Sequence, residues 1–172
     1  MSDELEIFLY GSEILRSACR PVERFDDELR ELCDGMIQAM TREDGIGLAA
    51  PQVGRDLRML IARDEREGWP RILPLVNPEF KVLSSERASF SEGCLSLPGI
   101  TAEVDRPVRV TVVYQDLEGA EQELTDDGLL ARIIQHEADH LEGILFVDHL
   151  PMLKRKLLAK KLKALARRSK VG

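Results

Sequence analysis

The residue types best suited to chemistry stand in the run 135–143, which reads QHEADHLEG. His136 and His140 are four positions apart, so on a helix they lie on one face and can bind the same ion. Glu137 stands about 100° round the helix, close enough to exchange protons with a water at that ion. Two solvated or buried histidines are the alternative, but the chain has only three histidines and two fall in this motif. The motif predicts a divalent metal site suited to hydrolysis.

The residues that follow the motif do not supply an obvious third metal ligand. Catalytic zinc-type sites take three protein ligands and leave one position for water. The extended protease pattern HExxHxxGxxH matches as far as Gly143, after which Phe146 stands in the position of its last histidine. Glu142 leaves the helix on a different side, and His149 falls in a turn before the last helix, where we expect a surface or capping residue.

Two upstream segments offer better candidates. The segment 92–99 reads EGCLSLPG, and Cys94 in it would complete a Cys-His-His set with an open fourth position. A small buried apolar side chain is the alternative for that cysteine. The segment 45–54, GIGLAAPQVG, contains three glycines, no charge and a single polar side chain, Gln52. Its glycines suggest a backbone that passes close to a ligand, to which Gln52 offers an N–H donor, and an apolar loop packed on the core is the alternative.

The elements that would position these residues follow from hydrophobic periodicity. Residues 26–42 are predicted to form a helix with Asp26 as its cap and one apolar face. A helix that begins at Thr125 or Asp126 and ends at Gly143 carries the two histidines. Strands are predicted at 57–62, 72–76, 79–83 and 108–114. The expected fold is α+β, with antiparallel β-sheets packed around a central metal-binding helix and followed by a C-terminal helix.

Taken together, the three segments make the chain resemble the peptide deformylases. That family is marked by a GxGLAAxQ segment, an EGCLS segment and a helix with two metal-binding histidines. This chain reads GIGLAAPQ at 45–52, EGCLS at 92–96 and QHEADH at 135–140, in the family order. Because three separate motifs agree, the resemblance is specific.

The resemblance implies a role for each matching residue. The metal ligands would be Cys94, His136 and His140. Glu137 would be the general acid and base, while Gln52 and the backbone N–H of Leu95 would donate hydrogen bonds to the formyl oxygen. Glu92 would stand behind the ligands, with Arg106 as its ion-pair partner.

The implied reaction is hydrolytic removal of the N-formyl group from the N-terminal formyl-methionine of newly synthesised polypeptides, with release of formate. Formyl-methionyl nascent peptides would be the substrates. Leu129 and Ile133 precede the two histidines on one helical stripe, so we expect them to receive the methionine side chain. A neighbouring stripe belongs to the core and consists of Leu130, Ile134 and Leu141. The expected substrate-binding residues are Ile46, Gly47, Gly93, Leu129 and Ile133.

The identity of the metal depends on more than the donor set. The residues themselves indicate one divalent ion per chain, held by one thiolate and two imidazoles. The general order of affinities favours zinc over iron(II) at such a site. The resemblance implies iron(II), with zinc, nickel or cobalt as substitutes in a purified sample.

Charge is divided unevenly along the chain. The 172 residues carry a net charge of −7, yet the segment 151–172 contains nine Lys or Arg and no acidic residue, so 1–150 holds 15 basic against 31 acidic residues. We expect a basic C-terminal helix that either docks on the body by its leucines or contacts the ribosome through RNA phosphates. The leucines that would form the docking stripe are Leu153, Leu157, Leu158, Leu162 and Leu165.

Length and composition restrict the class of protein. A chain of 172 residues is expected to form one catalytic domain, 1–172. No apolar stretch approaches the length of a membrane span, and the acidic start lacks the basic and apolar blocks of a secretion signal. Three cysteines without disulfide spacing favour a reducing compartment. We therefore expect a cytoplasmic enzyme without a membrane or DNA partner.

Two other functions remain open from the residues alone. A small metalloprotease built on the same helix would not need Cys94. A binding module with a structural metal would need a closed site of four ligands, and the sequence supplies no obvious fourth ligand. That module would also leave Gln52 without a purpose, so the deformylase is favoured.

Overall fold

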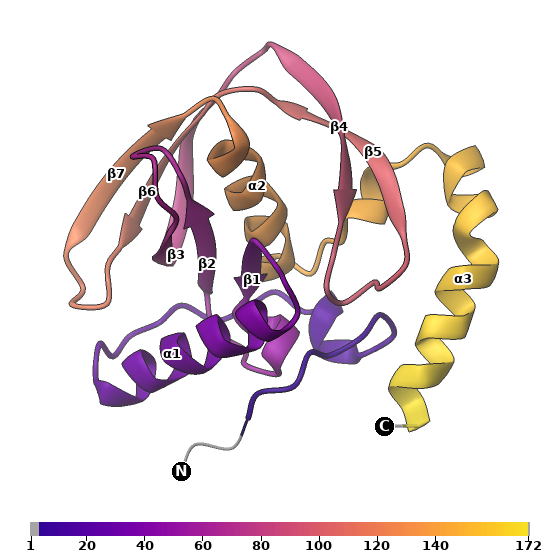
Figure 1. Ribbon diagram of the computed structural model, residues 1–172, viewed down its shortest axis with the longest axis horizontal. Coiled ribbons are helices and arrows are strands. Elements are labelled where there is room, and N and C mark those ends of the chain that lie inside the picture. The colour runs from indigo at the N-terminus through magenta and orange to yellow at the C-terminus, as the bar shows by residue number, and fades with distance from the viewer. Residues whose placement is uncertain (1–3, 172) are drawn as a thin grey trace.

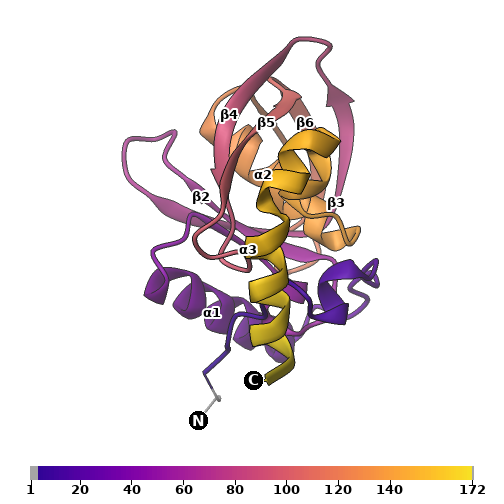
Figure 2. The same ribbon diagram turned by 90° about the vertical axis from the view of Figure 1, so that its right-hand side faces the viewer.

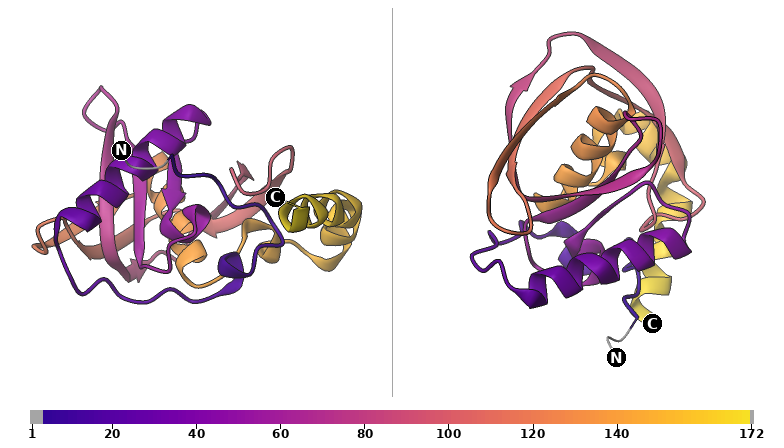
Figure 3. Two further views of the ribbon diagram at one scale, coloured as in Figure 1. Left: turned by 90° about the horizontal axis from the view of Figure 1, so that it is seen from below. Right: turned by 60° about the vertical axis from the view of Figure 1, so that its left-hand side comes forward.

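Two antiparallel sheets enclose one central helix. The structure, a computed structural model, describes residues 4–171, with side chains as far as Ser169. The central helix is α2 (Leu129–Leu141), α1 (Asp27–Arg42) runs below it, and α3 (Met152–Val171) lies at the outer edge beyond the smaller sheet (Figure 1). The strands wrap around α2 in the right-hand view of Figure 3. The prediction of an α+β fold, with antiparallel sheets packed around a central helix that carries the two histidines and with a C-terminal helix, is confirmed.

The larger sheet has five strands in the order β1-β2-β3-β6-β7, and each neighbouring pair is antiparallel. Its strands are β1 (Gly47–Ala49), β2 (Met59–Asp64), β3 (Arg71–Leu83), β6 (Val110–Gln115) and β7 (Glu121–Asp126). The smaller sheet has two antiparallel strands, β4 (Arg87–Gly93) and β5 (Thr101–Pro107). Three short 3-10 helices connect these elements: η1 (Glu13–Arg16), η2 (Ala50–Val53) and η3 (Phe146–His149).

Helix α1 forms where the sequence predicts it. Asp26 has extended backbone, and its side chain accepts a hydrogen bond from the Leu29 backbone N–H, which satisfies one of the donors at the helix start. Its apolar face packs on β1 and β2 in a core cluster that includes Cys33 and Met36. Burial raises the pKa of the Cys33 thiol to about 11, so this cysteine is a neutral core residue, as expected.

The strand predictions need one correction and several additions. The runs 72–76 and 79–83 are one strand, β3, because Asn77 adopts a left-handed conformation (φ 50°) and the register shifts there instead of the strand ending. The strands β1, β4, β5 and β7 were not predicted. The strand β4 reads RASFSEG, in which only Ala88 and Phe90 alternate with polar residues, and most of the strand is exposed, so its apolar signal is short.

The predicted start of α2, the helix that carries the two histidines, is wrong by about one turn. Strand β7 continues through Asp126, and α2 begins at Leu129 with Gly128 at its N-cap. Asp126 still serves the helix start, because its carboxylate accepts hydrogen bonds from the backbone N–H groups of Gly128 and Ala131. The predicted end is sound: α2 stops at Leu141, and Gly143 adopts a φ of 71°, a conformation that glycine accepts without strain.

The core is built on both sides of α2. Ile134 and Leu141 are fully buried and pack with residues of the five-stranded sheet, as predicted for this stripe. On the other side, Phe146 of η3 packs in a cluster with residues of β5 and α3. The helix that carries the histidines is therefore held from two directions.

Helix α3 docks by only part of its predicted stripe. Leu162 and Leu165 are buried and Leu158 packs beside them, but Leu153 and Leu157 are 72% and 77% exposed. The helix runs down the side of the body and its C-terminal end extends below it (Figure 2), and the two exposed leucines lie in its first two turns. The prediction that five leucines dock is thus wrong for the first two. Within the described residues, no helix is long and apolar enough to cross a membrane.

Candidate metal centre

Three side chains from two elements converge on one point. Cys94 follows directly after β4, while His136 and His140 project from one face of α2. One ligand atom from each lies within 4.8 Å of the others, and Cys94 Sγ is 3.4 Å from His140 Nε2. A tetrahedral ion bonded at about 2.3 Å to sulfur and about 2.0 Å to nitrogen would hold these two atoms about 3.5 Å apart. The donor set therefore fits a divalent metal ion.

Each histidine presents a nitrogen to this point. His136 Nδ1 donates a hydrogen bond of 2.8 Å to Glu92 Oε1, which leaves Nε2 of the same ring for a ligand. Burial lowers the pKa of His140 well below its usual value, so this ring is neutral and can act as a ligand. Burial also opposes a charge on His136, but hydrogen bonds with Cys94 and Glu92 raise its pKa to about 10. A metal ion that binds there must displace a proton.

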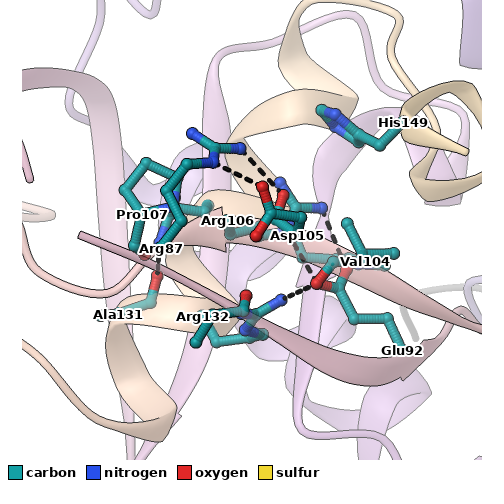
Figure 4. A network of polar contacts seen from close by, with 12 residues as sticks. Arg87, Glu92, Val104, Asp105, Arg106, Pro107, Ala131, Arg132 and His149 are labelled. Carbon is teal, nitrogen blue, oxygen red and sulfur yellow. Dashed lines mark hydrogen bonds and ion pairs between the residues drawn. The ribbon is translucent and has the colours of Figure 1, made fainter. Parts of the chain in front are cut away.

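A buried ion network lies behind His136. The predicted pairing is confirmed: Arg106 Nε and Nη2 donate to the two carboxylate oxygens of Glu92 at 2.7 and 3.0 Å. Arg106 Nη1 also donates to Asp139, which accepts a further hydrogen bond from His149. Burial alone would raise the pKa of Glu92, but the hydrogen bonds from His136 and Arg106 lower it strongly, so it stays a carboxylate. Figure 4 shows Glu92, Arg106 and His149 of this network, with Arg132 beside Glu92.

Glu137 lies beside the ligands without a structural partner. Its side chain is almost fully buried, and its Oε2 has no hydrogen-bond partner among the described residues. Burial raises its pKa to about 7, a value suited to taking up and releasing a proton near neutral pH. Gly47 leaves room for it, since a Cβ there would stand 2.7 Å from Glu137 Oε1 and from a methyl of Ile133.

Gln52 is fixed from both ends of its amide. The side chain is 1% exposed, and its Oε1 accepts a hydrogen bond of 2.9 Å from the Ala49 backbone N–H. Its Nε2 therefore faces the other way, where it donates to Ser96 Oγ at 3.1 Å and to Cys94 Sγ at 3.4 Å. Among residues 4–171 the backbone N–H of Leu95 has no intramolecular acceptor. One N–H donor thus reaches the thiol, and the residue after the thiol carries a second donor.

A cavity of about 660 Å³ opens beside His136 and Glu137. The expected substrate residues that line it are Ile46, Gly93, Leu129 and Ile133. Ile46 and Leu129 are about half exposed at its mouth, whereas Ile133 is 4% exposed at its inner end. The space is large enough for an apolar side chain together with part of a peptide backbone.

Sequence reasoning missed two side chains at this site. Phe146, in the position where the extended protease pattern has its last histidine, stacks on His136 with ring centroids 5.9 Å apart. Arg132 lies one turn before His136 and donates to Glu92. A charged residue on the helical stripe of the histidines was the available signal for Arg132. His149 lies at the surface, as expected, and its imidazole forms a hydrogen bond with Asp139.

The comparisons with known proteins agree with this geometry. The polypeptide deformylase family model matches residues 4–156. The peptide deformylase of Brucella suis is 47% identical over 161 residues, which cover 93% of this chain and 92% of the relative. That of Chromohalobacter salexigens is also 47% identical over 161 residues, covering 92% and 93% of the two chains.

Solved structures agree as well. A plant peptide deformylase aligns with a TM-score of 0.92 at 38% identity, covering 98% of this chain and 92% of the other. The Thermus thermophilus peptide deformylase aligns with a TM-score of 0.88 at 38% identity, covering 95% and 98%. The chain therefore belongs to the polypeptide deformylases, the metal-dependent hydrolases that remove the N-formyl group from the first methionine of newly made polypeptides.

Proposed function

We propose that Cys94, His136 and His140 bind one divalent metal ion and that deformylation takes place at this ion. The observation that carries the proposal is the convergence of one thiol and two imidazoles within 4.8 Å beside a buried carboxyl group. A bound ion would lower the pKa of a water molecule and polarise the formyl oxygen. Three protein ligands leave one position open for that chemistry.

We propose iron(II) as the ion in the cell. Imidazole and thiolate donors accept iron(II), zinc, nickel and cobalt, so the donor set alone does not select among them. Iron(II) follows from the resemblance to the deformylases. Metal analysis of protein purified without oxygen tests the choice: about one iron per chain supports it, and zinc in its place contradicts it.

In the proposed mechanism Glu137 moves the proton. Its carboxylate takes a proton from the attacking water as the new C–O bond forms at the formyl carbon. It then delivers that proton to the peptide nitrogen as the C–N bond breaks, so that formate and a free amine leave. Burial supports this role, because a carboxyl group with a pKa near the working pH can act in both directions.

Gln52 and Leu95 would stabilise the charge that develops on the formyl oxygen. The Gln52 Nε2 is held by the Ala49 contact, and the Leu95 N–H has no other acceptor within residues 4–171. Donors fixed before the reaction stabilise an oxyanion without a cost of reorganisation. The cavity beside His136 and Glu137 would receive the methionine side chain, with Ile46, Gly47, Gly93, Leu129 and Ile133 as the substrate-binding residues.

Formate release from a formyl-Met tripeptide is the deciding experiment for these roles. The protein is prepared without oxygen and loaded with iron(II) or nickel(II), and Glu137→Ala is compared with it. We expect formate from the parent and a loss of about 100-fold or more in the variant. A folded, metal-loaded parent that releases no formate would contradict the proposal, and so would an unimpaired variant.

We further propose that α3 contacts the ribosome, where the substrate emerges. Lys160, Lys161 and Lys163 are exposed, and a basic helical face attracts phosphate. Deleting α3 would also expose the core around Leu162, so charge removal is the cleaner test. The variant neutralises Lys160, Lys161 and Lys163, and its control neutralises three exposed basic residues of the body: Arg55, Lys81 and Arg109.

The readout is co-sedimentation with ribosomes at about 50 mM and about 200 mM salt. We expect the α3 variant to bind more weakly and with a smaller dependence on salt than the parent, while the control resembles the parent. Equal binding by the α3 variant and the parent would contradict a contact through this helix.

We also propose that residues 1–172 form one catalytic domain that acts in the cytoplasm. Two of the core clusters share strands of the larger sheet, and α2 of the first stacks on Phe146 of the third through His136. All three cysteines are free thiols, which suits a reducing compartment. Limited proteolysis and cell fractionation test these two points. A stable cleaved half, or the enzyme outside the cytoplasm, would contradict them.

A further inference from the structure

Arg132 lies at the junction between α2 and the two-stranded sheet, and the proposed chemistry does not use it. It stands one turn before His136, and its side chain is only 13% exposed. Its Nη1 donates to Glu92 Oε2 and to the carbonyl of Val104, both at 2.8 Å. Its Nη2 donates to the carbonyl of Ala88 at 2.7 Å. One side chain of α2 thus reaches both strands of the small sheet (Figure 4).

This junction matters because the metal ligands come from its two sides. Cys94 is at the end of β4, whereas His136 and His140 are on α2. A two-stranded sheet is marginally stable by itself, so its position depends on what it is attached to. Whatever sets the distance between β4 and α2 also sets the distance between the sulfur and the two imidazoles.

A second contact of Arg132 involves the wall of the cavity. Its guanidinium lies 5.1 Å from the centre of the Phe90 ring, a cation–π contact. Phe90 is 61% exposed, and it lines the same cavity as Arg132. The arginine therefore holds an aromatic side chain of β4 in place as well as the backbone of both strands.

The network has a second arginine, Arg106, which connects the same two elements from the side of the sheet. Arg106 projects from β5, binds Glu92 within its own sheet and reaches α2 through Asp139. Arg132 projects from α2 and reaches the sheet. The planar guanidinium suits such a role, because its fork of donors can serve several acceptors at fixed angles, which an ammonium group cannot do.

We propose that Arg132 is a positioning residue that clamps the β4–β5 sheet onto α2, so that Cys94 and the two histidines keep the spacing that binds the metal. The inference rests on the proposed metal site. It adds a residue that touches neither metal nor formyl group and acts through Glu92 and the strand carbonyls.

The test compares Arg132→Met, Arg132→Lys and, as a matched control, the exposed Arg109→Met. Each full-length protein is loaded with cobalt(II), and the dissociation constant is measured by competition with a chelator. The absorption bands of the cobalt–thiolate bond report whether Cys94 is still a ligand. The unfolding midpoint of the metal-free proteins separates a loss of fold from a loss of metal geometry.

We expect Arg132→Met to bind cobalt about 10- to 100-fold more weakly, the usual effect of removing a partner behind a metal ligand, with altered thiolate bands. Arg132→Lys keeps the charge but cannot reach all three acceptors, so it should remain weak. Arg109→Met should match the parent. If Arg132→Met does not fold, Arg132→Lys decides.

A folded Arg132→Met that keeps the cobalt affinity and the thiolate bands of the parent would overturn the clamp. Full recovery of the cobalt affinity by Arg132→Lys would also overturn it, since charge alone would then suffice. A parent that binds no cobalt would overturn the proposed metal site together with this inference. A parent that binds one cobalt beside unchanged variants would overturn only the inference, so the two failures can be told apart.

Discussion

Helix α2 and helix α3 are both regular helices, but they present their charged and polar groups to different surroundings. Of its 13 residues α2 buries nine, including His136, Glu137 and His140. Among the described side chains of α3, only Leu162 and Leu165 are buried, and the lysines from Lys154 to Lys163 are exposed. A buried charge must have a partner or a function, whereas an exposed charge is satisfied by water. Replacing a charged residue should therefore change stability or activity strongly near α2 and only weakly on α3.

The largest effect on stability is expected from Arg106→Met. This change leaves the buried carboxylate of Glu92 and the partly exposed carboxylate of Asp139 short of a partner, and breaking a buried ion pair from one side costs about 3–5 kcal/mol. Urea unfolding of the metal-free protein measures it. A cost below about 1 kcal/mol, typical of an exposed pair, would remove the contrast between the two helices.

Gln52→Ala should act on turnover more than on stability. Removing one oxyanion donor raises the barrier by about 3 kcal/mol, or about 100-fold or more in kcat. The backbone N–H of Ala49 also loses its acceptor, so a smaller loss of stability should accompany it. Formate release and urea unfolding on the same samples compare the two. A variant that unfolds easily but keeps its kcat would contradict the role of Gln52.

A matched pair of substitutions compares a buried and an exposed leucine of α3. Leu162→Ala should lower the free energy of unfolding by about 2 kcal/mol, because Leu162 is buried. Leu157→Ala should change it by less than about 0.5 kcal/mol, since Leu157 is 77% exposed. Thermal unfolding of both variants is the measurement. Equal losses would mean that the first turns of α3 are also packed in solution.

A buried carboxylate away from both helices extends the comparison to pH. Asp64 is 1% exposed, and hydrogen bonds from Arg66 and Arg71 outweigh burial and lower its pKa. A lowered pKa in the folded state stabilises the protein above the unfolded-state pKa of about 3.9, and this stability is lost as the pH falls further. Asp64→Asn should therefore be less stable than the parent by about 1–2 kcal/mol at neutral pH.

The difference between Asp64→Asn and the parent should shrink as the pH falls below about 4. Urea unfolding at several pH values measures it. A difference that stays constant down to acid pH would show that the charge of Asp64 does not contribute.

Local signals explain what could be predicted along the chain. The spacing of His136 and His140 predicts a shared face because helical period is a local property. Asp26 predicts the start of α1 for the same reason, since a cap acts on the N–H groups just after it. The ion pair of Glu92 with Arg106 was also predicted, through the resemblance. Local rules were weaker at the start of α2, where β7 continues through residues that also suit a helix cap.

The order of residues is enough to place two imidazoles and a carboxyl group on one helix, and a thiol and a glutamine in distinctive segments. It does not show that Arg132 bridges α2 and the small sheet, that Phe146 stacks on His136, or that Leu162 docks while Leu157 does not. These contacts come from the folded chain, because burial and pairing depend on neighbours distant in the sequence. A helical period shows which side chains share a face, but not what that face meets.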